Sequence, residues 1–118
     1  MFDLGVHHVS LNVTDAAEAR RFYVDVLGLT ERPDRPDFTF DGSWLQAGDQ
    51  QIHLLEVDDF VPPVGQHFAL RIGDIEAARA HLARHGVEVS EAKRVDDICL
   101  QAFFSDPTGN LIELNQPL

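Results

Sequence analysis

The second half of this chain repeats the residue pattern of its first half at a nearly constant spacing. His8–Val13 matches His67–Ile72 at an offset of 59 residues (67 − 8), and Ile52–Leu54 matches Ile112–Leu114 at an offset of 60 (112 − 52). A repeat of this length indicates one supersecondary unit used twice. We therefore expect two related modules that pair about a pseudo-twofold axis.

Each module reads as a strand, a helix and three further strands. In the first strand Val9, Leu11 and Val13 occupy one face, which is typical of a strand packed on helices on one side only. A capping aspartate follows in both modules, Asp15 and Asp74, again 59 residues apart (74 − 15). The pattern predicts an α+β domain over residues 1–118, with module one at about 4–58 and module two at about 65–116.

The helices and strands can be placed from periodicity and turn residues. Apolar residues at helical spacing predict one helix from Asp15 to Gly28 and a second over about 75–85. The Asp106–Gly109 stretch has the composition of a tight turn between the last two strands. The other strands are expected at 29–32, 38–40, 43–47, 51–57, 86–90 and 98–104, with 38–40 and 43–47 forming a hairpin around Asp41-Gly42.

Charge and composition exclude several classes of function. The net charge of −11 argues against binding to nucleic acid or to an anionic membrane, since phosphates would be repelled. No apolar run approaches the roughly 20 residues of a membrane span, and the first residues lack the features of a signal peptide. A cytoplasmic protein with a small-molecule partner is expected. The single cysteine, Cys99, lies in an apolar run and is expected to be a buried small hydrophobe.

Four potential metal ligands lie at corresponding places of the two modules. The first strands carry His8 and His67, and the last strands carry His53 and Glu113. Each is out of phase with the residues of its own strand that pack on helices, so pairing the modules would bring the four side chains together inside a curved sheet. Imidazoles and carboxylates are ligands for Zn²⁺, Ni²⁺, Fe²⁺ and Mn²⁺. His53 could instead line the cavity and bond a substrate.

The sequence resembles the vicinal oxygen chelate superfamily, which includes glyoxalase I, bleomycin resistance proteins and extradiol dioxygenases. The resemblance covers nearly the whole chain, and the stretches that carry it are His8–Val13, Ala19–Leu29, Gly65–Leu70 and Asp106–Leu114. It implies paired βαβββ units that form a cupped mixed sheet around a divalent metal ion, with the helices on the outer face. It also implies a homodimer.

The resemblance assigns roles to individual residues. His8, His67 and Glu113 match the usual metal positions of the family, and Glu113 is also the candidate catalytic group. The remaining family position falls on His53, where glyoxalase I has Glu or Gln, and this departure argues against a glyoxalase I assignment.

Polar residues on the face away from the helices are the candidate substrate contacts. These are Ser10, Asn12 and Arg71, although Arg71 could instead be an ordinary ion-pair partner. The phase of Trp44 does not decide between the cavity and the core.

Two functions therefore remain open. The first is a divalent-metal-dependent enzyme of lyase, isomerase or dioxygenase type, in which the metal binds two neighbouring oxygen atoms of a small substrate. The second is a metal-independent protein that sequesters an antibiotic, which suits the acidic charge. A complete ligand set favours the enzyme, and metal analysis would distinguish the two.

Overall fold

The computed structural model describes residues 2–118 and divides the chain into two compact units. The first unit ends at Phe60 and the second begins at Val61. No helix among the described residues is long and apolar enough to cross a membrane.

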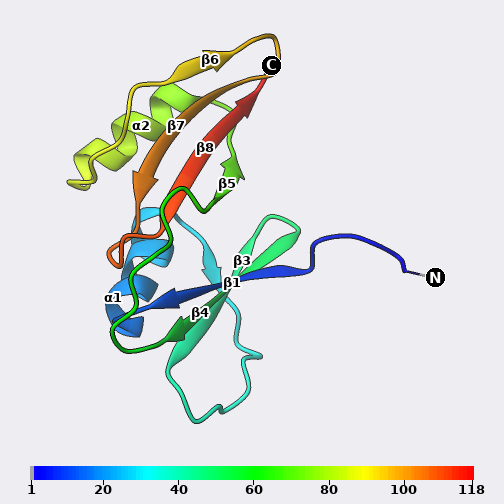
Figure 1. Cartoon of the computed structure of the whole chain (residues 1–118), viewed down its shortest axis with the longest axis vertical. Coiled ribbons are helices and arrows are strands. Elements are labelled where there is room, and N and C mark those ends of the chain that lie inside the picture. Colours follow the sequence, from blue (N-terminus) through cyan, green and yellow to red (C-terminus); the bar gives the residue numbers. More distant parts are fainter. Residues whose placement is uncertain (1) are drawn as a thin grey trace. The chain divides into compact units, whose positions relative to one another are not determined.

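The first unit is a four-stranded mixed sheet with one helical segment (Figure 1). Its sheet order is β1-β4-β3-β2, in which β1 runs parallel to β4 and the other neighbours are antiparallel. The elements are β1 (His8–Val13), α1 (Ala16–Arg21), the π-helical turn η1 (Phe22–Val26), β2 (Thr30–Glu31), β3 (Gly42–Ala47) and β4 (Gln50–Glu56).

The second unit has the same topology. Its sheet order is β5-β8-β7-β6, with β5 parallel to β8 and the remaining pairs antiparallel. The elements are β5 (His67–Arg71), α2 (Ile75–Arg84), β6 (Lys93–Val95), β7 (Cys99–Ser105) and β8 (Leu111–Pro117). The predicted α+β class and the βαβββ order of each half are confirmed.

The first helix differs from the prediction at its C-terminal half. An α-helix was expected up to Gly28, but residues Phe22–Val26 form a π-helical turn in which the amide of Leu27 donates to the carbonyl of Phe22. Adjacent Phe22 and Tyr23 are both buried here. Single π-helical turns of this kind interrupt α-helices and are frequent at functional sites. Gly28 then closes the segment at φ +80, as expected of a residue after a helix end.

Two predicted strands are wrong. Residues 38–40 form no strand, because Arg35 donates to the carbonyl of Phe40 and holds this stretch as a loop before β3. Residues 86–90 also form no strand. There the Ser90 amide donates to the Phe103 carbonyl of β7 at 2.9 Å, but the Ser90 carbonyl accepts from Nε of Arg79, and the edge strand is β6.

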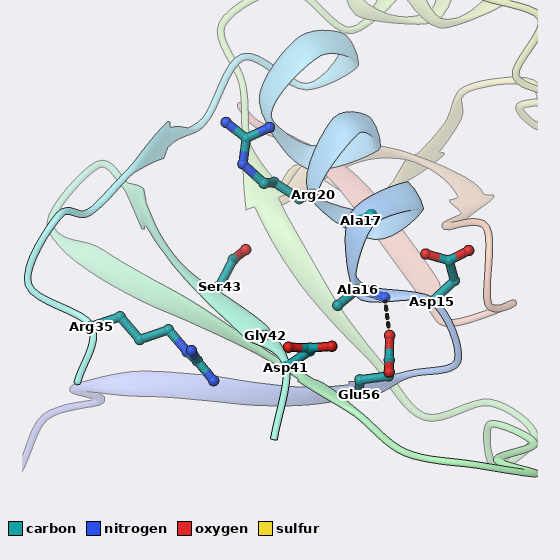
Figure 2. Close-up of a pocket in the computed structure, with 9 residues that line it drawn as sticks. All are labelled: Asp15, Ala16, Ala17, Arg20, Arg35, Asp41, Gly42, Ser43 and Glu56. Carbon is teal, nitrogen blue, oxygen red and sulfur yellow. Dashed lines mark hydrogen bonds between the residues drawn. The ribbon is translucent and has the colours of Figure 1, made fainter. Parts of the chain in front are cut away.

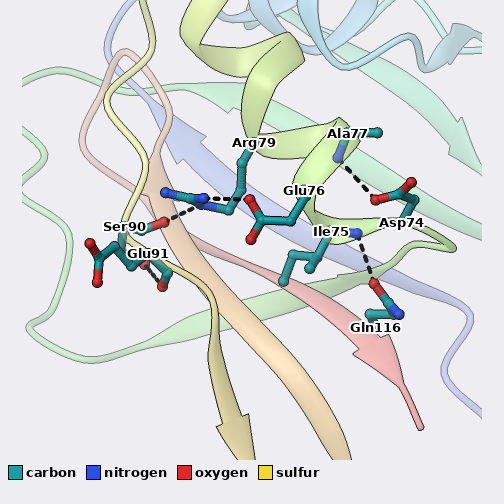
Figure 3. A network of polar contacts seen from close by, with 8 residues as sticks. All are labelled: Asp74, Ile75, Glu76, Ala77, Arg79, Ser90, Glu91 and Gln116. Carbon is teal, nitrogen blue, oxygen red and sulfur yellow. Dashed lines mark hydrogen bonds and ion pairs between the residues drawn. The ribbon is translucent and has the colours of Figure 1, made fainter.

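Side-chain caps fix α2 against its sheet (Figure 3). Asp74 accepts from the amide of Ala77 at 3.0 Å, and Oε1 of Gln116 on β8 accepts from the amide of Ile75 at 2.8 Å. Two of the amides that a helix N-terminus leaves without intrahelical partners are therefore satisfied, one of them by the sheet itself. The predicted cap at Asp74 is confirmed.

The turn before β8 is held by one buried carboxylate. Oδ1 of Asp106 accepts from the amides of Thr108, Gly109 and Asn110 at 3.0, 2.9 and 2.8 Å. Its Oδ2 accepts from Nδ2 of Asn110 at 2.9 Å. The predicted turn is confirmed, and it sets where β8, the strand of Glu113, begins.

The last strand of each unit places a polar side chain between buried apolar neighbours. Ile52 and Leu54 on β4 are buried, as are Ile112 and Leu114 on β8. Because successive side chains alternate between the faces of a strand, the residues between them project to the opposite face. His53 and Glu113 are those residues, as the sequence phase predicted.

Candidate functional site

In the first unit, three aromatic rings from three strands form one stack. The His53 ring lies parallel to the Trp44 ring, with centroids 4.3 Å apart and planes 8° apart. Its other neighbour is His8, whose centroid lies 4.0 Å away with planes 16° apart. The strand register explains the stack, because His53 is paired directly with Trp44. The ring of Trp44, whose environment the sequence left open, lies beside His53.

The polar atoms of the two histidines have partners close by in the chain. Nε2 of His53 lies 2.9 Å from Oε1 of Gln51, so this nitrogen donates and Nδ1 carries the lone pair. Nδ1 of His8 lies 2.8 Å from Nδ1 of His7, so one of these two nitrogens holds the proton of a shared hydrogen bond. The other ring nitrogen of each, Nε2 of His8 and Nδ1 of His53, is therefore the one that could bind a ligand.

The surroundings of His53 favour its neutral form. Burial lowers the pKa of His53 below its ordinary value, and the neighbouring rings of His8 and His7 lower it further. His53 is only 7% exposed, so its charged form would lose most of its hydration. A neutral imidazole is the form that binds a metal ion or accepts a hydrogen bond.

In the second unit, a histidine faces a buried carboxylate. Nε2 of His67 lies 3.1 Å from Oε1 of Glu113, which is 7% exposed. The parallel pairing of β5 and β8 sets His67 opposite Leu111 and Ala69 opposite Glu113, so the two side chains meet diagonally. Oε2 of Glu113 accepts from Nδ2 of Asn115 at 2.8 Å. Both carboxylate oxygens are thereby oriented.

The tautomer of His67 can be read from its other contact. Nδ1 of His67 lies 2.9 Å from the carbonyl oxygen of Gly65. A carbonyl oxygen only accepts, so Nδ1 carries the hydrogen. In the neutral ring, Nε2 is then a lone pair that faces the carboxylate oxygen of Glu113. Two lone pairs that face each other repel, unless a proton or another cation lies between them.

The structure places the seven predicted site residues as two groups. His8 lies beside His53 in one unit, and His67 lies beside Glu113 in the other. Within each unit, the described residues include no group of three or more His, Cys, Asp or Glu side chains that could hold a metal ion. The ligand set of four therefore stays a prediction.

The predicted substrate contacts lie on the first strand of each unit. Ser10 and Asn12 are exposed on β1 and share a face with His8, and Arg71 is exposed on β5 and shares a face with His67. Across the described part of the chain, Arg71 takes part in no ion pair. The ordinary ion-pair role that the sequence left open for it does not occur here.

A separate cavity of about 260 Å³ lies between α1 and β3 (Figure 2). Glu56 closes one side, where its Oε2 accepts from the amide of Ala16 at 2.8 Å. Ser43 lines this cavity and shares its strand face with buried Leu45, whereas Trp44 projects to the opposite face. The cavity therefore belongs to the helix side of the sheet, and no histidine lines it.

Sequence reasoning missed the side chains that support the site. Gln51 and Asn115 orient His53 and Glu113, and each lies two residues away on the same strand. Period-two spacing placed them on the correct face, but nothing in the pattern marked them as hydrogen-bond partners. The stacking of the loop residues Phe38 and Phe40, whose ring centroids lie 5.0 Å apart, was also missed, because a strand was expected there.

Comparison with known proteins finds a matching family profile and a relative of similar length. The profile of the Glyoxalase/Bleomycin resistance protein/Dioxygenase superfamily matches residues 5–114. The uncharacterized protein YaeR of Escherichia coli K12 is 35% identical over 124 residues, covering 92% of this chain and 93% of YaeR.

Two solved structures share the fold. TnmS3, an antibiotic binding protein from Streptomyces sp. CB03234, is 34% identical with a TM-score of 0.82, covering 100% of this chain and 99% of TnmS3. The fosfomycin resistance protein FosX of Listeria monocytogenes, solved as its E126Q mutant with Mn(II) and a dihydroxypropylphosphonic acid, is 20% identical with a TM-score of 0.85. The alignment covers 100% of this chain and 95% of the FosX chain. At 20% identity, the similarity shows a shared fold only.

Proposed function

The chain belongs to the Glyoxalase/Bleomycin resistance protein/Dioxygenase superfamily, and on this premise we propose that it is a divalent-metal-dependent enzyme. The reaction is of lyase, isomerase or dioxygenase type, glyoxalase-like in its use of the metal. The substrate is a small molecule that presents two neighbouring oxygen atoms. The metal is one of Zn²⁺, Ni²⁺, Fe²⁺ and Mn²⁺, which accept imidazole and carboxylate ligands.

One observation carries the proposal: Nε2 of His67 and Oε1 of Glu113 face each other at 3.1 Å while Nδ1 of His67 is committed to the Gly65 carbonyl. Metal-binding histidines typically donate their second ring N–H to a carbonyl in this way, which fixes the tautomer. A cation bound by Nε2 of His67 and Oε1 of Glu113 would remove the repulsion between the lone pairs of these two atoms. The donor set therefore fits a divalent metal ion.

The proposed ligands are His8, His67 and Glu113, with His53 as a fourth ligand. When bound, a divalent ion supplies a Lewis acid that stabilises negative charge on a substrate oxygen. Glu113 is also the proposed catalytic group, because its carboxylate, once it leaves the metal, can accept a proton from the substrate. Asn115 keeps Oε2 engaged, so Oε1 is the atom that faces His67 and the proposed metal.

Substrate contacts are proposed on the two first strands. Ser10 and Asn12 offer hydroxyl and amide groups beside His8 on β1. Arg71, exposed beside His67 on β5, offers a cation that suits a carboxylate or other oxygen-rich group of the substrate. These residues would orient the substrate oxygens.

Metal titration tests the proposal. Protein stripped with a chelator is titrated with Zn²⁺ and Mn²⁺ by calorimetry, together with His67→Ala and Glu113→Gln. We expect submicromolar binding by the wild type for at least one of these ions and a loss of at least tenfold in each variant. His85→Ala, a matched change at the end of α2, should bind as the wild type does. Equal affinity in all four proteins would refute the proposal.

A second candidate function is metal-independent sequestration of an antibiotic. TnmS3, described as an antibiotic binding protein, is 34% identical over the whole chain, and the net charge of −11 suits a cationic ligand. Metal-free bleomycin is the probe for this candidate. Micromolar binding of bleomycin together with absent metal affinity would favour sequestration over the enzyme.

We also propose that the protein is a homodimer. The edge strands β1 and β5 of the two sheets each have one side without a partner strand in the described structure, and such edges favour pairing between chains. Sedimentation at micromolar concentration should give twice the monomer mass of 13.2 kDa. A monomer at this concentration would contradict the assignment.

A further inference from the structure

We propose that the cavity between α1 and β3 binds a small zwitterion, that is, a molecule with one ammonium group and one carboxylate. This cavity of about 260 Å³ lies within the first unit, on the face of β3 opposite to Trp44 and the histidine stack. None of the proposed metal ligands lines it, so the inference does not rest on the proposed metal-dependent function.

Two hydrogen-bond donors in the cavity lining have no acceptor among the described residues. Ser43 is only 4% exposed, and its hydroxyl group makes no hydrogen bond to another described residue. Nε of Arg35 is enclosed by the protein and has no hydrogen-bond partner there either. A buried donor without an acceptor costs free energy, and native structures keep few of them. The two donors therefore indicate an occupant that presents acceptor oxygen atoms.

The guanidinium group of Arg35 is held in place beside the cavity (Figure 2). Its Nη2 donates to the Phe40 carbonyl at 2.8 Å, and its central carbon lies 5.0 Å from the Phe38 ring centroid. At Gly42, a Cβ atom would lie 3.1 Å from Nη2 and 2.1 Å from the Leu54 carbonyl oxygen, so only glycine fits between them. A cation that is already fixed loses little conformational freedom when it binds a ligand.

The same cavity is lined by three carboxylates, those of Asp15, Asp41 and Glu56 (Figure 2). Asp15 and Glu56 accept from backbone amides, whereas the Asp41 carboxylate has no partner among the described residues and forms no ion pair with Arg35. These carboxylates repel a simple anion, and a simple cation would leave the two donors without acceptors. A zwitterion meets both requirements, with its ammonium group at Asp41 and its carboxylate at Ser43 and Arg35.

The probes are free glycine, β-alanine and 4-aminobutyrate, three zwitterions whose charged groups lie at increasing separations. Acetate, propionate and butyrate are their counterparts without the ammonium group. Each compound is titrated into the full ¹⁵N-labelled chain after chelator treatment, so that metal binding plays no part. The backbone amide of Gly42 and the Nε–H group of Arg35 report from the cavity lining.

We expect at least one zwitterion to bind with a Kd of about 1 mM or tighter, which a ligand of this size can reach. Its counterpart should bind about tenfold more weakly, because it lacks the charge that pairs with Asp41. Ser43→Ala and Arg35→Lys should each weaken zwitterion binding by about tenfold, the effect of one lost hydrogen bond to a charged group. Asp41→Asn should reduce zwitterion affinity to that of the counterpart. Arg94→Lys, at an exposed arginine of β6, is the matched control and should bind as the wild type does.

Three results would overturn the inference. The first is no shift of either reporter group with about 10 mM of any of the three zwitterions, ten times the expected Kd. The second is equal binding of a zwitterion and its counterpart, which would indicate a site for carboxylates in general. The third is wild-type affinity in Ser43→Ala and Asp41→Asn proteins whose thermal midpoints show that they fold. The first two comparisons use the wild type alone, so they stand even if a variant does not fold.

Discussion

Replacing Asn115 by Ala tests how the second unit prepares Glu113 for a cation. Nδ2 of Asn115 donates to Oε2 of Glu113 at 2.8 Å, which is a short hydrogen bond to a carboxylate. Such bonds contribute about 1.5–3 kcal/mol. Asn115 is half-buried, so water replaces part of the lost bond, and the lower end of that range applies.

The expected loss of metal affinity is therefore about 10- to 30-fold, since about 1.4 kcal/mol corresponds to a factor of ten. This agrees with the roughly 10- to 100-fold effect of removing residues that orient metal ligands. The assay is competition for Zn²⁺ between the protein and a chromophoric chelator. Gln66→Ala, which removes an exposed amide next to His67, is the control and should change affinity less than twofold. An Asn115→Ala protein that binds as tightly as the wild type would refute the reasoning.

Two further predictions concern stability. Asp106→Ala removes the carboxylate that accepts from the amide and the side chain of buried Asn110, so urea unfolding should show a loss of about 3–5 kcal/mol in the free energy of unfolding. A loss under 1 kcal/mol, comparable to that of exposed Asp97→Ala, would contradict this. Because the pKa of His53 is lowered in the fold, the unfolded chain binds more protons below about pH 6.5, and the free energy of unfolding of metal-free protein should fall as the pH falls through that range. His53→Phe, which keeps a ring beside Trp44, should flatten this dependence, and an unchanged pH profile would count against the assignment.

The sequence predicted the elements whose signals are local. The caps at Asp15 and Asp74 and the turn at Asp106 were found because a carboxylate near backbone amides leaves a clear pattern. The repeat predicted the order of elements in both halves, since each copy must bury the same apolar face.

The parts that the sequence did not predict depend on hydrogen bonds from arginine side chains to loop carbonyls. The loop around Phe38 and Phe40 resembles a strand in composition, but Arg35 bonds the Phe40 carbonyl and the two rings stack on each other. Residues 86–90, which precede β6, form no strand, and Nε of Arg79 from α2 donates to the Ser90 carbonyl. Neither competing hydrogen bond has a signature in local composition, because each depends on how the chain folds back on itself.

Imidazole ¹⁵N spectra, recorded with and without Zn²⁺, test the central claim most directly. We predict that one equivalent of Zn²⁺ shifts Nε2 of His67 and one ring nitrogen of His8 to values typical of metal-bound imidazole, while Nδ1 of His67 keeps its hydrogen on the Gly65 carbonyl. Shifts confined to His81 and His85 on the second helical segment, or no shift at all, would contradict the claim that this chain holds a divalent metal ion through His8, His67 and Glu113.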